Sequence, residues 1–110
     1  MKLRNKVSIV VGGARGIGKA VSLAFAREGS DVLVVGNSKT KYPTSGSEEV
    51  SEKLRAMGRK SLSFDIDVSD GKQVKEMVKT GLDAFGRIDV LTNVAAIVMK
   101  SAIEDLSEQD

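Results

Sequence analysis

Apolar runs and amphipathic segments alternate along the chain, and their spacing predicts both strands and helices. The continuous apolar run at 7–11 predicts a strand buried on both faces, and further strands are predicted at 32–35, 61–66 and 88–91. Apolar residues at helical spacing predict a helix after each of the first three strands, and another helix after Ser101. Gly29, Gly58 and Gly86 are expected to end the first three helices.

The same spacing predicts the buried side and the start of each helix. Ser45 and Glu48 form a capping-box pattern at the start of the second helix, and Ser69 or Asp70 is expected to cap the third. Gly81 within the third helix lowers helix stability by about 1 kcal/mol relative to Ala. The apolar face of the first helix is expected to contain Ile17, Ala20, Val21, Ala24 and Phe25.

Strands that alternate with helices are typical of an α/β protein with right-handed crossovers and a parallel sheet. The expected strand order is 3-2-1-4, with helices on both faces, as in a Rossmann-type fold. Ligands bind at the carboxyl ends of such strands, which here are the segments 12–18, 36–39, 67–68 and 93–96. These segments lie far apart in sequence but are expected along one edge of the sheet.

Composition narrows the class of protein. The chain has 110 residues, which is one domain or part of one, and its hydrophobic content of 41% with 29% charged residues is typical of a globular protein. A net charge of +2 without a basic run argues against nucleic-acid binding, and no apolar stretch reaches the ~18 residues of a membrane span. The absence of Cys and His excludes disulfides and histidine-based catalytic or metal sites, so we expect no metal and a cytoplasmic location.

Three glycines spaced GxxxGxG follow the first strand directly, at Gly12, Gly16 and Gly18. A strand, a glycine turn and a helix together form a seat for a pyrophosphate, because the backbone can approach the phosphates and the helix start offers free N–H groups. Gly13 to Lys19 also fits GxxxxGK, but the next residue of an ATPase phosphate loop is Ser or Thr and here it is Ala20. A turn that serves only chain geometry is the other alternative.

Four features in order resemble the N-terminal portion of the short-chain dehydrogenase/reductase family. They are the glycine loop, Asp67-Val68 after the third strand, the segment 85–91 before and within the fourth, and Asn93-Val94-Ala95-Ala96, where the family has NNAG. The resemblance covers essentially the whole chain. It implies an oxidoreductase that moves a hydride between a nicotinamide cofactor and a carbonyl or alcohol substrate.

The resemblance also implies roles for individual residues. Gly12 makes the tight turn, Asp67 accepts a hydrogen bond from the adenine amino group, and the Val68 backbone lies beside the ring. The alternative for Asp67 is that it only begins the turn before Ser69. The alternative for Asn93 is that it only forms a hydrogen bond with the backbone of its loop. The residues expected against the pyrophosphate and adenosine are Arg15, Gly16, Ile17 and Gly18, and those lining the adenosine ribose are Asn93 and Ala95.

The chain departs from the family pattern at three positions. Val11 replaces the usual Thr before the first glycine, so a hydroxyl that ties strand and turn together is missing. Val94 cannot make the side-chain hydrogen bond of the second Asn of NNAG. Ala96 adds a methyl group where the backbone usually passes close to the cofactor.

The end of the second strand favours NADP over NAD. NAD-preferring folds place Asp or Glu there, on the ribose 2′-hydroxyl, whereas this chain has Asn37, Ser38 and Lys39. No carboxylate repels a 2′-phosphate, and Arg15 and Lys39 supply positive charge. Lys39 as a solvated loop lysine is the alternative.

The family's catalytic Ser and Tyr-x-x-x-Lys lie later than the matched stretch. Tyr42 is the only tyrosine, and Gly46 stands where the lysine would be needed, so no catalytic residue is expected in the chain. We expect residues 1–110 to be the N-terminal dinucleotide-binding half of one domain, without its catalytic half and with little turnover. The parent protein is expected to be a homo-oligomer. A non-catalytic nucleotide-binding or interaction module, complete at this length, is the competing hypothesis.

Overall fold

The computed structural model describes residues 1–40 and 42–94, which form four strands and three helices. The predicted helix after Ser101, and the predicted contacts of Ala95 and Ala96, lie outside these residues. The elements in chain order are β1 (Val7–Val11), α1 (Gly16–Arg27), β2 (Asp31–Asn37), α2 (Ser47–Ala56), β3 (Ser61–Ile66), α3 (Gly71–Phe85) and β4 (Val90–Asn93).

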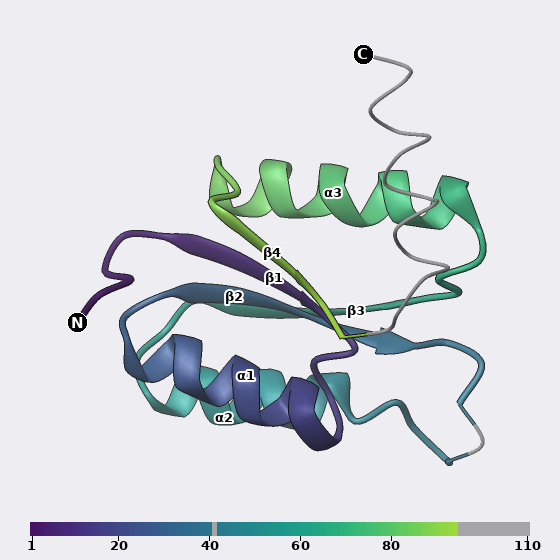
Figure 1. Cartoon of the computed structure of the whole chain (residues 1–110), viewed down its shortest axis with the longest axis horizontal. Helices are drawn as coiled ribbons and strands as arrows, with labels where there is room; N and C mark the ends of the chain where they lie inside the picture. Colours follow the sequence, from purple (N-terminus) through teal and green to yellow (C-terminus); the bar gives the residue numbers. More distant parts are fainter. Residues whose placement is uncertain (41, 95–110) are drawn as a thin grey trace.

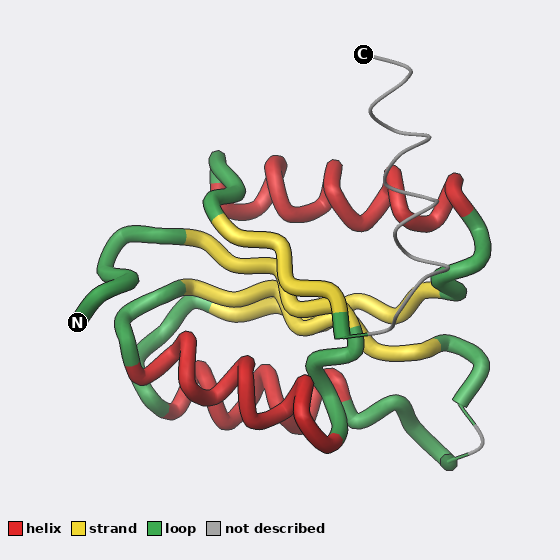
Figure 2. Tube along the Cα trace, viewed as in Figure 1, coloured by secondary structure: helices red, strands yellow, loops and turns green. Residues whose placement is uncertain are grey.

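The four strands form one parallel sheet in the order β3-β2-β1-β4, as predicted. Figures 1 and 2 show the sheet between two helical layers, with α1 and α2 on one face and α3 on the other. In the register, Val11 lies beside both Val35 and Asn93, while Asn37 lies beside Ile66. The carboxyl ends of the strands therefore meet at one edge, which is where the predicted ligand segments converge.

Each face of the sheet has its own core cluster. Ile9, Leu33 and Met77 belong to the cluster under α3, whereas Val10, Val34 and Leu54 belong to the cluster under α1 and α2. Successive side chains of a strand point to opposite faces, so a strand with apolar residues on both faces contributes to both clusters. All five residues of β1 are buried, as that strand pattern predicts.

The predicted buried face of α1 is wrong in part. Ala20 and Ala24 are exposed, and the Ile17 residue is 74% exposed. The buried residues are Gly18, Ser22 and Ala26, with Val21 and Phe25 packed partly against the core. Small residues are buried here because α1 lies very close to the glycine loop. Apolar periodicity does not predict how closely a helix approaches a neighbouring loop.

The predicted capping box of α2 is also wrong. Gly46 takes the N-cap position in a left-handed conformation, and Ser45 lies one residue before it. The Glu48 carboxylate accepts hydrogen bonds from Ser63 Oγ at 2.5 Å and from Arg55 at 2.8 Å, rather than from backbone near Ser45. The predicted cap of α3 is confirmed at Asp70, whose side chain accepts from the Lys72 N–H at 2.9 Å.

Two strand boundaries differ from prediction. The second strand extends to Asn37, two residues beyond the apolar run, because its edge remains paired with β3 up to Ile66. The fourth strand runs from Val90 to Asn93 rather than over 88–91. Asp89 precedes it and accepts hydrogen bonds from the Val7 N–H at 2.8 Å and from Arg87, and the ladder with β1 begins only at Val90.

Gly81 lies in the middle of α3, where glycine lowers helix propensity. It is buried, and a Cβ there would lie 3.2 Å from Ile9 Cδ1 and 3.6 Å from Leu33 Cδ2. The missing side chain therefore lets α3 lie close to the sheet.

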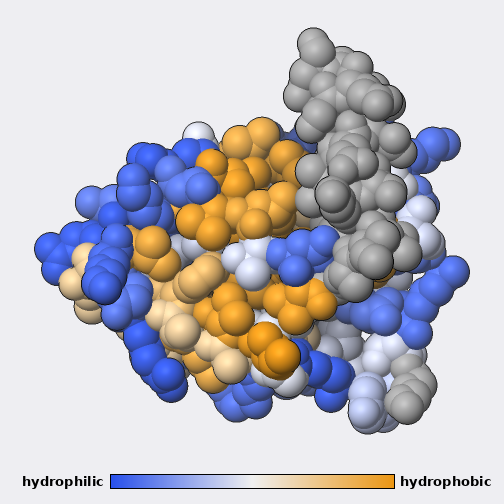
Figure 3. All heavy atoms as spheres, viewed as in Figure 1, coloured by the Kyte–Doolittle hydropathy of each residue, from blue (hydrophilic) through white to orange (hydrophobic). Residues whose placement is uncertain are grey.

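Apolar side chains gather on the face that carries β4 (Figure 3). Leu82 of α3 and Leu91 of β4 are 47% and 38% exposed. Among the residues described, β4 has a neighbouring strand on one side only. None of the helices in the described part of the chain is long and apolar enough to cross a membrane.

Candidate functional site

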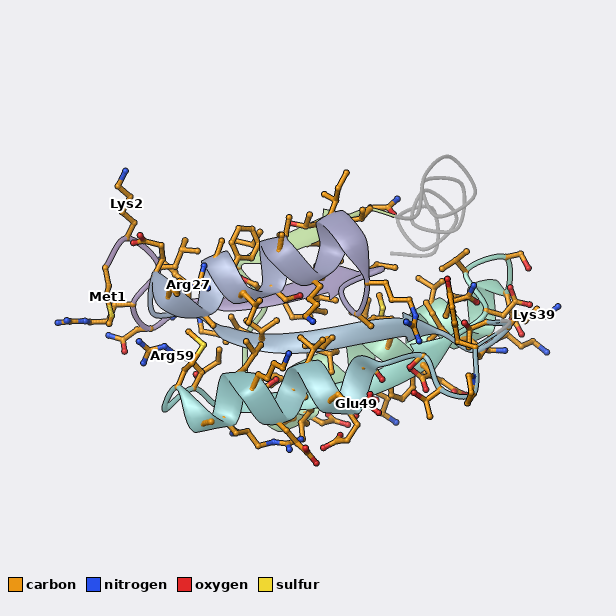
Figure 4. All side chains as sticks on the ribbon, turned by 90° about the horizontal axis from the view of Figure 1, so that it is seen from below. Met1, Lys2, Arg27, Lys39, Glu49 and Arg59 are labelled. Atoms are coloured by element: carbon orange, nitrogen blue, oxygen red, sulfur yellow. The ribbon has the colours of Figure 1, made fainter. Side chains whose placement is uncertain are left out.

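A cleft of about 420 Å3 opens at the carboxyl ends of β1 and β2. Figure 4 shows Lys39 at this end of the molecule, opposite Met1, Lys2 and Arg59. The described residues that line the cleft come from the glycine loop, the end of β2 and the segment that leads to α2. They are Gly12, Ala14, Arg15, Gly36, Asn37, Lys39, Thr40, Tyr42 and Ser45.

Four of the sequence-predicted site residues line this cleft, namely Gly12, Arg15, Asn37 and Lys39. The others lie around it or beyond it. Asn93 is exposed at the end of β4, beside Val11 in the register, and the next N–H, that of Val94, donates to the Val11 carbonyl at 3.0 Å. Val68 is partly buried against the core cluster under α3. Ala95 lies outside the described residues.

The glycine loop is built from left-handed backbone. Gly12 has a φ of 81° and Gly16 a φ of 52°, a region that residues with a Cβ rarely adopt. The Gly12 and Gly13 N–H groups both donate to the Val35 carbonyl, at 2.9 and 3.1 Å, which ties the loop to β2. The turn requires glycine at these positions for conformational reasons.

Gly18 and Ser22 hold α1 against this loop. A Cβ on Gly18 would overlap the Gly12 carbonyl oxygen, so only glycine fits there. The buried Ser22 hydroxyl lies 3.1 Å from the Gly13 carbonyl and 3.0 Å from the Gly18 carbonyl, to which it donates. Sequence reasoning missed Ser22, because a serine in the middle of an apolar helix has no motif of its own.

The first turn of α1 has no side-chain cap. Arg15 takes the N-cap position with extended backbone, and its side chain makes no hydrogen bond to the helix. Free N–H groups and the positive end of the helix dipole attract anions. The first turn of α1 therefore has free donors at the position where the glycine spacing predicts a pyrophosphate.

Arg15 reaches instead toward the segment between β2 and α2. Its Nη2 donates to the Thr44 carbonyl at 2.7 Å, and its Cζ lies 4.0 Å from the centre of the Tyr42 ring. Sequence reasoning excluded Tyr42 as the catalytic tyrosine and considered the loop from Asn37 to Gly46 for adenosine-side specificity, but it did not single out Tyr42 as part of the cleft. No periodicity links residues of two different loops, so the sequence carries no signal for this contact.

Lys39 and Asp67 form an ion pair, with Nζ 3.1 Å from Oδ2. The other carboxylate oxygen of Asp67 accepts from the Ser69 hydroxyl at 2.6 Å and from the Ser69 N–H at 3.0 Å. The Ser69 hydrogen bonds, followed by Lys39, lower the pKa of Asp67 to about 2. Asp67 is therefore charged at neutral pH and begins the turn before α3, which was one of its two predicted roles.

The segment after β2 is anchored from β3. Asp65 accepts hydrogen bonds from Ser45 Oγ at 2.6 Å and Ser47 Oγ at 2.8 Å, and the Ser47 N–H donates to Ser45 Oγ at 3.1 Å. Gly36 lies beside Asp65 in the register, and a Cβ on it would collide with both Asp65 and Ser45. These contacts fix one wall of the cleft.

A second, smaller hollow of about 260 Å3 lies on the other side of Arg15, between α1 and α2. Lys19 and Lys53 both line it, and Lys53 lowers the pKa of Lys19 through the proximity of the two ammonium groups. Glu49 lies on the same rim and accepts from the Thr44 hydroxyl at 3.4 Å. Within residues 1–40 and 42–94, Arg15, Lys19 and Lys53 take part in none of the ion pairs.

Comparison with known proteins agrees with this architecture. Residues 6–110 match the family model described as short chain dehydrogenase. Over 107 residues the chain is 37% identical to a 3-oxoacyl-(acyl-carrier-protein) reductase of Staphylococcus epidermidis, a match that covers 96% of the chain and 42% of that protein. An uncharacterized oxidoreductase of Methylorubrum extorquens is 36% identical over 110 residues, with 98% and 42% covered.

Solved structures give the same result. A short chain dehydrogenase from Burkholderia cenocepacia in complex with NADP has a TM-score of 0.79 and 31% identity, over 88% of this chain and 38% of that one. A blue fluorescent protein from a metagenomic library, in complex with NADPH, has a TM-score of 0.80 and 32% identity over the same shares. The chain thus spans about two-fifths of the length of the proteins it matches.

Proposed function

The chain belongs to the short-chain dehydrogenase/reductase family, and from this membership we propose that it is the dinucleotide-binding portion of an NADP-dependent oxidoreductase. When bound, the nicotinamide supplies the hydride that passes to or from a carbonyl or alcohol carbon. The residues described here bind and orient the cofactor. Residues 1–110 by themselves bind the dinucleotide weakly and do not turn it over, because the chain has no Ser with a Tyr-x-x-x-Lys.

The observation that carries the proposal is the cleft between the left-handed glycine loop and the end of β2. Gly12 and Gly16 let the backbone approach a pyrophosphate, and the uncapped first turn of α1 donates to it. Gly18 keeps α1 close to the loop, while Ile17 lies exposed beside it. In this proposal Asn93 and Ala95 line the adenosine ribose, and Val68 lies beside the adenine.

The preference for NADP rests on charge at the end of β2. Arg15 and Lys39 line the cleft together with Asn37, and none of the described lining residues carries a carboxylate that would repel a 2′-phosphate. Ser38 adds a hydroxyl next to Asn37. Two solved relatives are named as complexes with NADP and NADPH, which supports the same choice.

The test is cofactor binding by the full-length protein that carries this chain. We expect nicotinamide fluorescence titrations to give a Kd for NADPH at least about 10-fold lower than that for NADH. NADPH at 100 times its Kd then stabilises the protein by about 2.7 kcal/mol, which a thermal melt detects. MgATP is the control for the phosphate-loop alternative and is expected to have no effect.

Each result has a definite consequence. Failure to bind either dinucleotide would overturn the proposal, and tighter binding of NADH would overturn the choice of coenzyme. Binding without NADPH oxidation, across a panel of ketone and aldehyde substrates, would favour a nucleotide-binding module over an enzyme. We further propose, from the family resemblance, a cytoplasmic homo-oligomer, which sedimentation of the native protein tests.

A further inference from the structure

We propose that Tyr42 is a specificity-determining positioning residue, which holds the Arg15 guanidinium at the wall of the cleft where a phosphate ester on the adenosine ribose would meet it. The inference rests on the proposed NADP-binding function. It concerns a residue outside every motif on which the family resemblance was based.

The first step is the contact itself. The Arg15 Cζ lies 4.0 Å from the centre of the Tyr42 ring, and both residues line the cleft. A cation over an aromatic face is attracted by the ring quadrupole, and the planar guanidinium can lie flat on it. Stacking uses the face of the guanidinium, so the N–H donors at its edge remain able to bind an anion.

The second step concerns the hydrogen-bond donors of Arg15 that remain available to a ligand. Its Nη2 donates to the Thr44 carbonyl at 2.7 Å, which leaves most of the five guanidinium donors for another partner. The Tyr42 ring and the Thr44 carbonyl belong to the same short segment. Together they restrict a long side chain that would otherwise lose much conformational freedom on binding a ligand.

The third step is the rigidity of that segment. Ser45 and Ser47 are both bonded to Asp65 of β3, and the Tyr42 N–H donates to Thr40 Oγ1 at 3.2 Å. Ser45, three residues after Tyr42, is thus tied to the sheet, and the Thr40 contact restrains the backbone of Tyr42 itself. An arginine held in advance by a fixed wall binds a phosphate with less loss of entropy than a free one.

The fourth step distinguishes Arg15 from Lys39, which is the other cation among the described residues of the cleft lining. Lys39 is paired with Asp67 at 3.1 Å, whereas no ion pair of the described residues includes Arg15. The uncompensated charge is therefore on the arginine that Tyr42 holds. Arginine also binds phosphate through two parallel N–H donors, which makes its orientation important.

The experiment compares two probes that differ in a single phosphate, adenosine 2′,5′-bisphosphate and 5′-AMP, by calorimetry on the full-length protein. We expect Tyr42→Leu to weaken binding of the bisphosphate about 2- to 5-fold, which is the effect of losing one cation–π contact at an exposed site. Binding of 5′-AMP is expected to stay unchanged. Tyr42→Phe keeps the ring and is expected to retain the wild-type preference. In an Arg15→Met background, Tyr42→Leu is expected to have no further effect on the preference.

A merely structural role for Tyr42 would weaken both probes equally, and that result would overturn the inference, as would an unchanged preference in Tyr42→Leu. Wild-type protein that binds NADPH and NADH equally well would overturn the inference and the coenzyme choice, but not dinucleotide binding. Wild-type protein that binds neither would overturn the proposed function itself.

Discussion

Lys39 Nζ lies 3.1 Å from Asp67 Oδ2, so two residues expected to contact different parts of an adenosine also contact each other. Lys39 follows β2 and Asp67 follows β3, and the pairing of these two strands brings them together. The ion pair therefore links the cation near the predicted 2′-phosphate position to the carboxylate near the predicted adenine position. Removal of Lys39 is therefore expected to raise the pKa of Asp67.

The pKa of Asp67 is the first quantity to test. It lies at about 2, chiefly because Ser69 donates two hydrogen bonds and secondarily because of Lys39. We expect both Ser69→Ala and Lys39→Met to raise it toward the ordinary value of about 3.9, with the larger change in Ser69→Ala. Carboxyl 13C NMR of Asp67 across acidic pH measures both changes.

The same pKa predicts the pH dependence of stability. A carboxyl whose folded pKa is lower than its unfolded pKa stabilises the fold above pH ~4, and the contribution is lost as the pH falls toward about 2. As the pH falls through this interval, the free energy of unfolding of Lys39→Met should therefore decrease less than that of the wild type. Equal pKa values for Asp67 in the wild type and both variants would contradict this account.

Gly18→Ala tests the close approach of α1 to the glycine loop. The added Cβ would overlap the Gly12 carbonyl oxygen, and both atoms belong to backbone, so the helix itself has to move. We expect destabilisation of about 3 kcal/mol or more and loss of dinucleotide binding. The matched control is Gly71→Ala at the first residue of α3, where nothing lies within 4 Å of the new Cβ.

Urea unfolding of the two variants measures the difference. Gly71→Ala is expected to be neutral or to stabilise by up to about 1 kcal/mol, because it only reduces the freedom of the unfolded chain. Similar stabilities for the two variants would mean that α1 does not depend on the missing side chain at Gly18.

Asp65→Ala tests the anchoring of the cleft wall. The substitution removes the acceptor of Ser45 Oγ and Ser47 Oγ, two residues that are only 8% and 4% exposed. Ser45 Oγ also donates to Ser47 Oγ at 3.0 Å, so it is the buried Ser47 hydroxyl that loses its acceptor. An unpaired buried hydroxyl is costly, so we expect a loss of about 1–2 kcal/mol of stability together with weaker NADPH binding. Asp83→Ala, on the exposed side of α3, is the control and is expected to change stability by less than about 0.5 kcal/mol.

Amide hydrogen exchange localises the effect of Asp65→Ala. We expect faster exchange at the Ser47 N–H, which donates to Ser45 Oγ, and unchanged exchange in β1. Uniformly faster exchange throughout the sheet would instead indicate global destabilisation.

Lys53→Gln tests the repulsion between α1 and α2. Lys53 lowers the pKa of Lys19, which means that the folded state disfavours the charged form of Lys19 and is destabilised at pH values below its folded pKa. Removing one of the two charges should raise the Lys19 pKa and the melting temperature at neutral pH. NMR titration of the Lys19 side chain and thermal melts measure the two effects.

Salt provides a second check on Lys53→Gln. At about 1 M salt the screening length falls to about 3 Å, so the gain in melting temperature should shrink. Lys79→Gln on α3 is the control, since Lys79 is exposed and forms none of the ion pairs in the described part of the chain. An equal effect of Lys79→Gln would show that only the net charge matters.

The hydrophobic pattern was sufficient to predict most of the fold. The alternation of strands and helices and the buried β1 follow from apolar spacing. The order β3-β2-β1-β4 was expected from the strand order of a Rossmann-type fold. The left-handed turn at Gly12 was likewise predictable, because few other residues adopt that conformation. These features depend on local chemistry and on short connections.

The tertiary structure alone decided which side chains meet. Apolar spacing placed Ile17 in the buried face of α1. Gly18 and Ser22 are buried instead, because the helix lies close to the glycine loop. Loops have no period, so the sequence could not pair Arg15 with Tyr42 or Lys39 with Asp67. Contacts of this kind depend on the path of the chain between strands, which only the packed sheet defines.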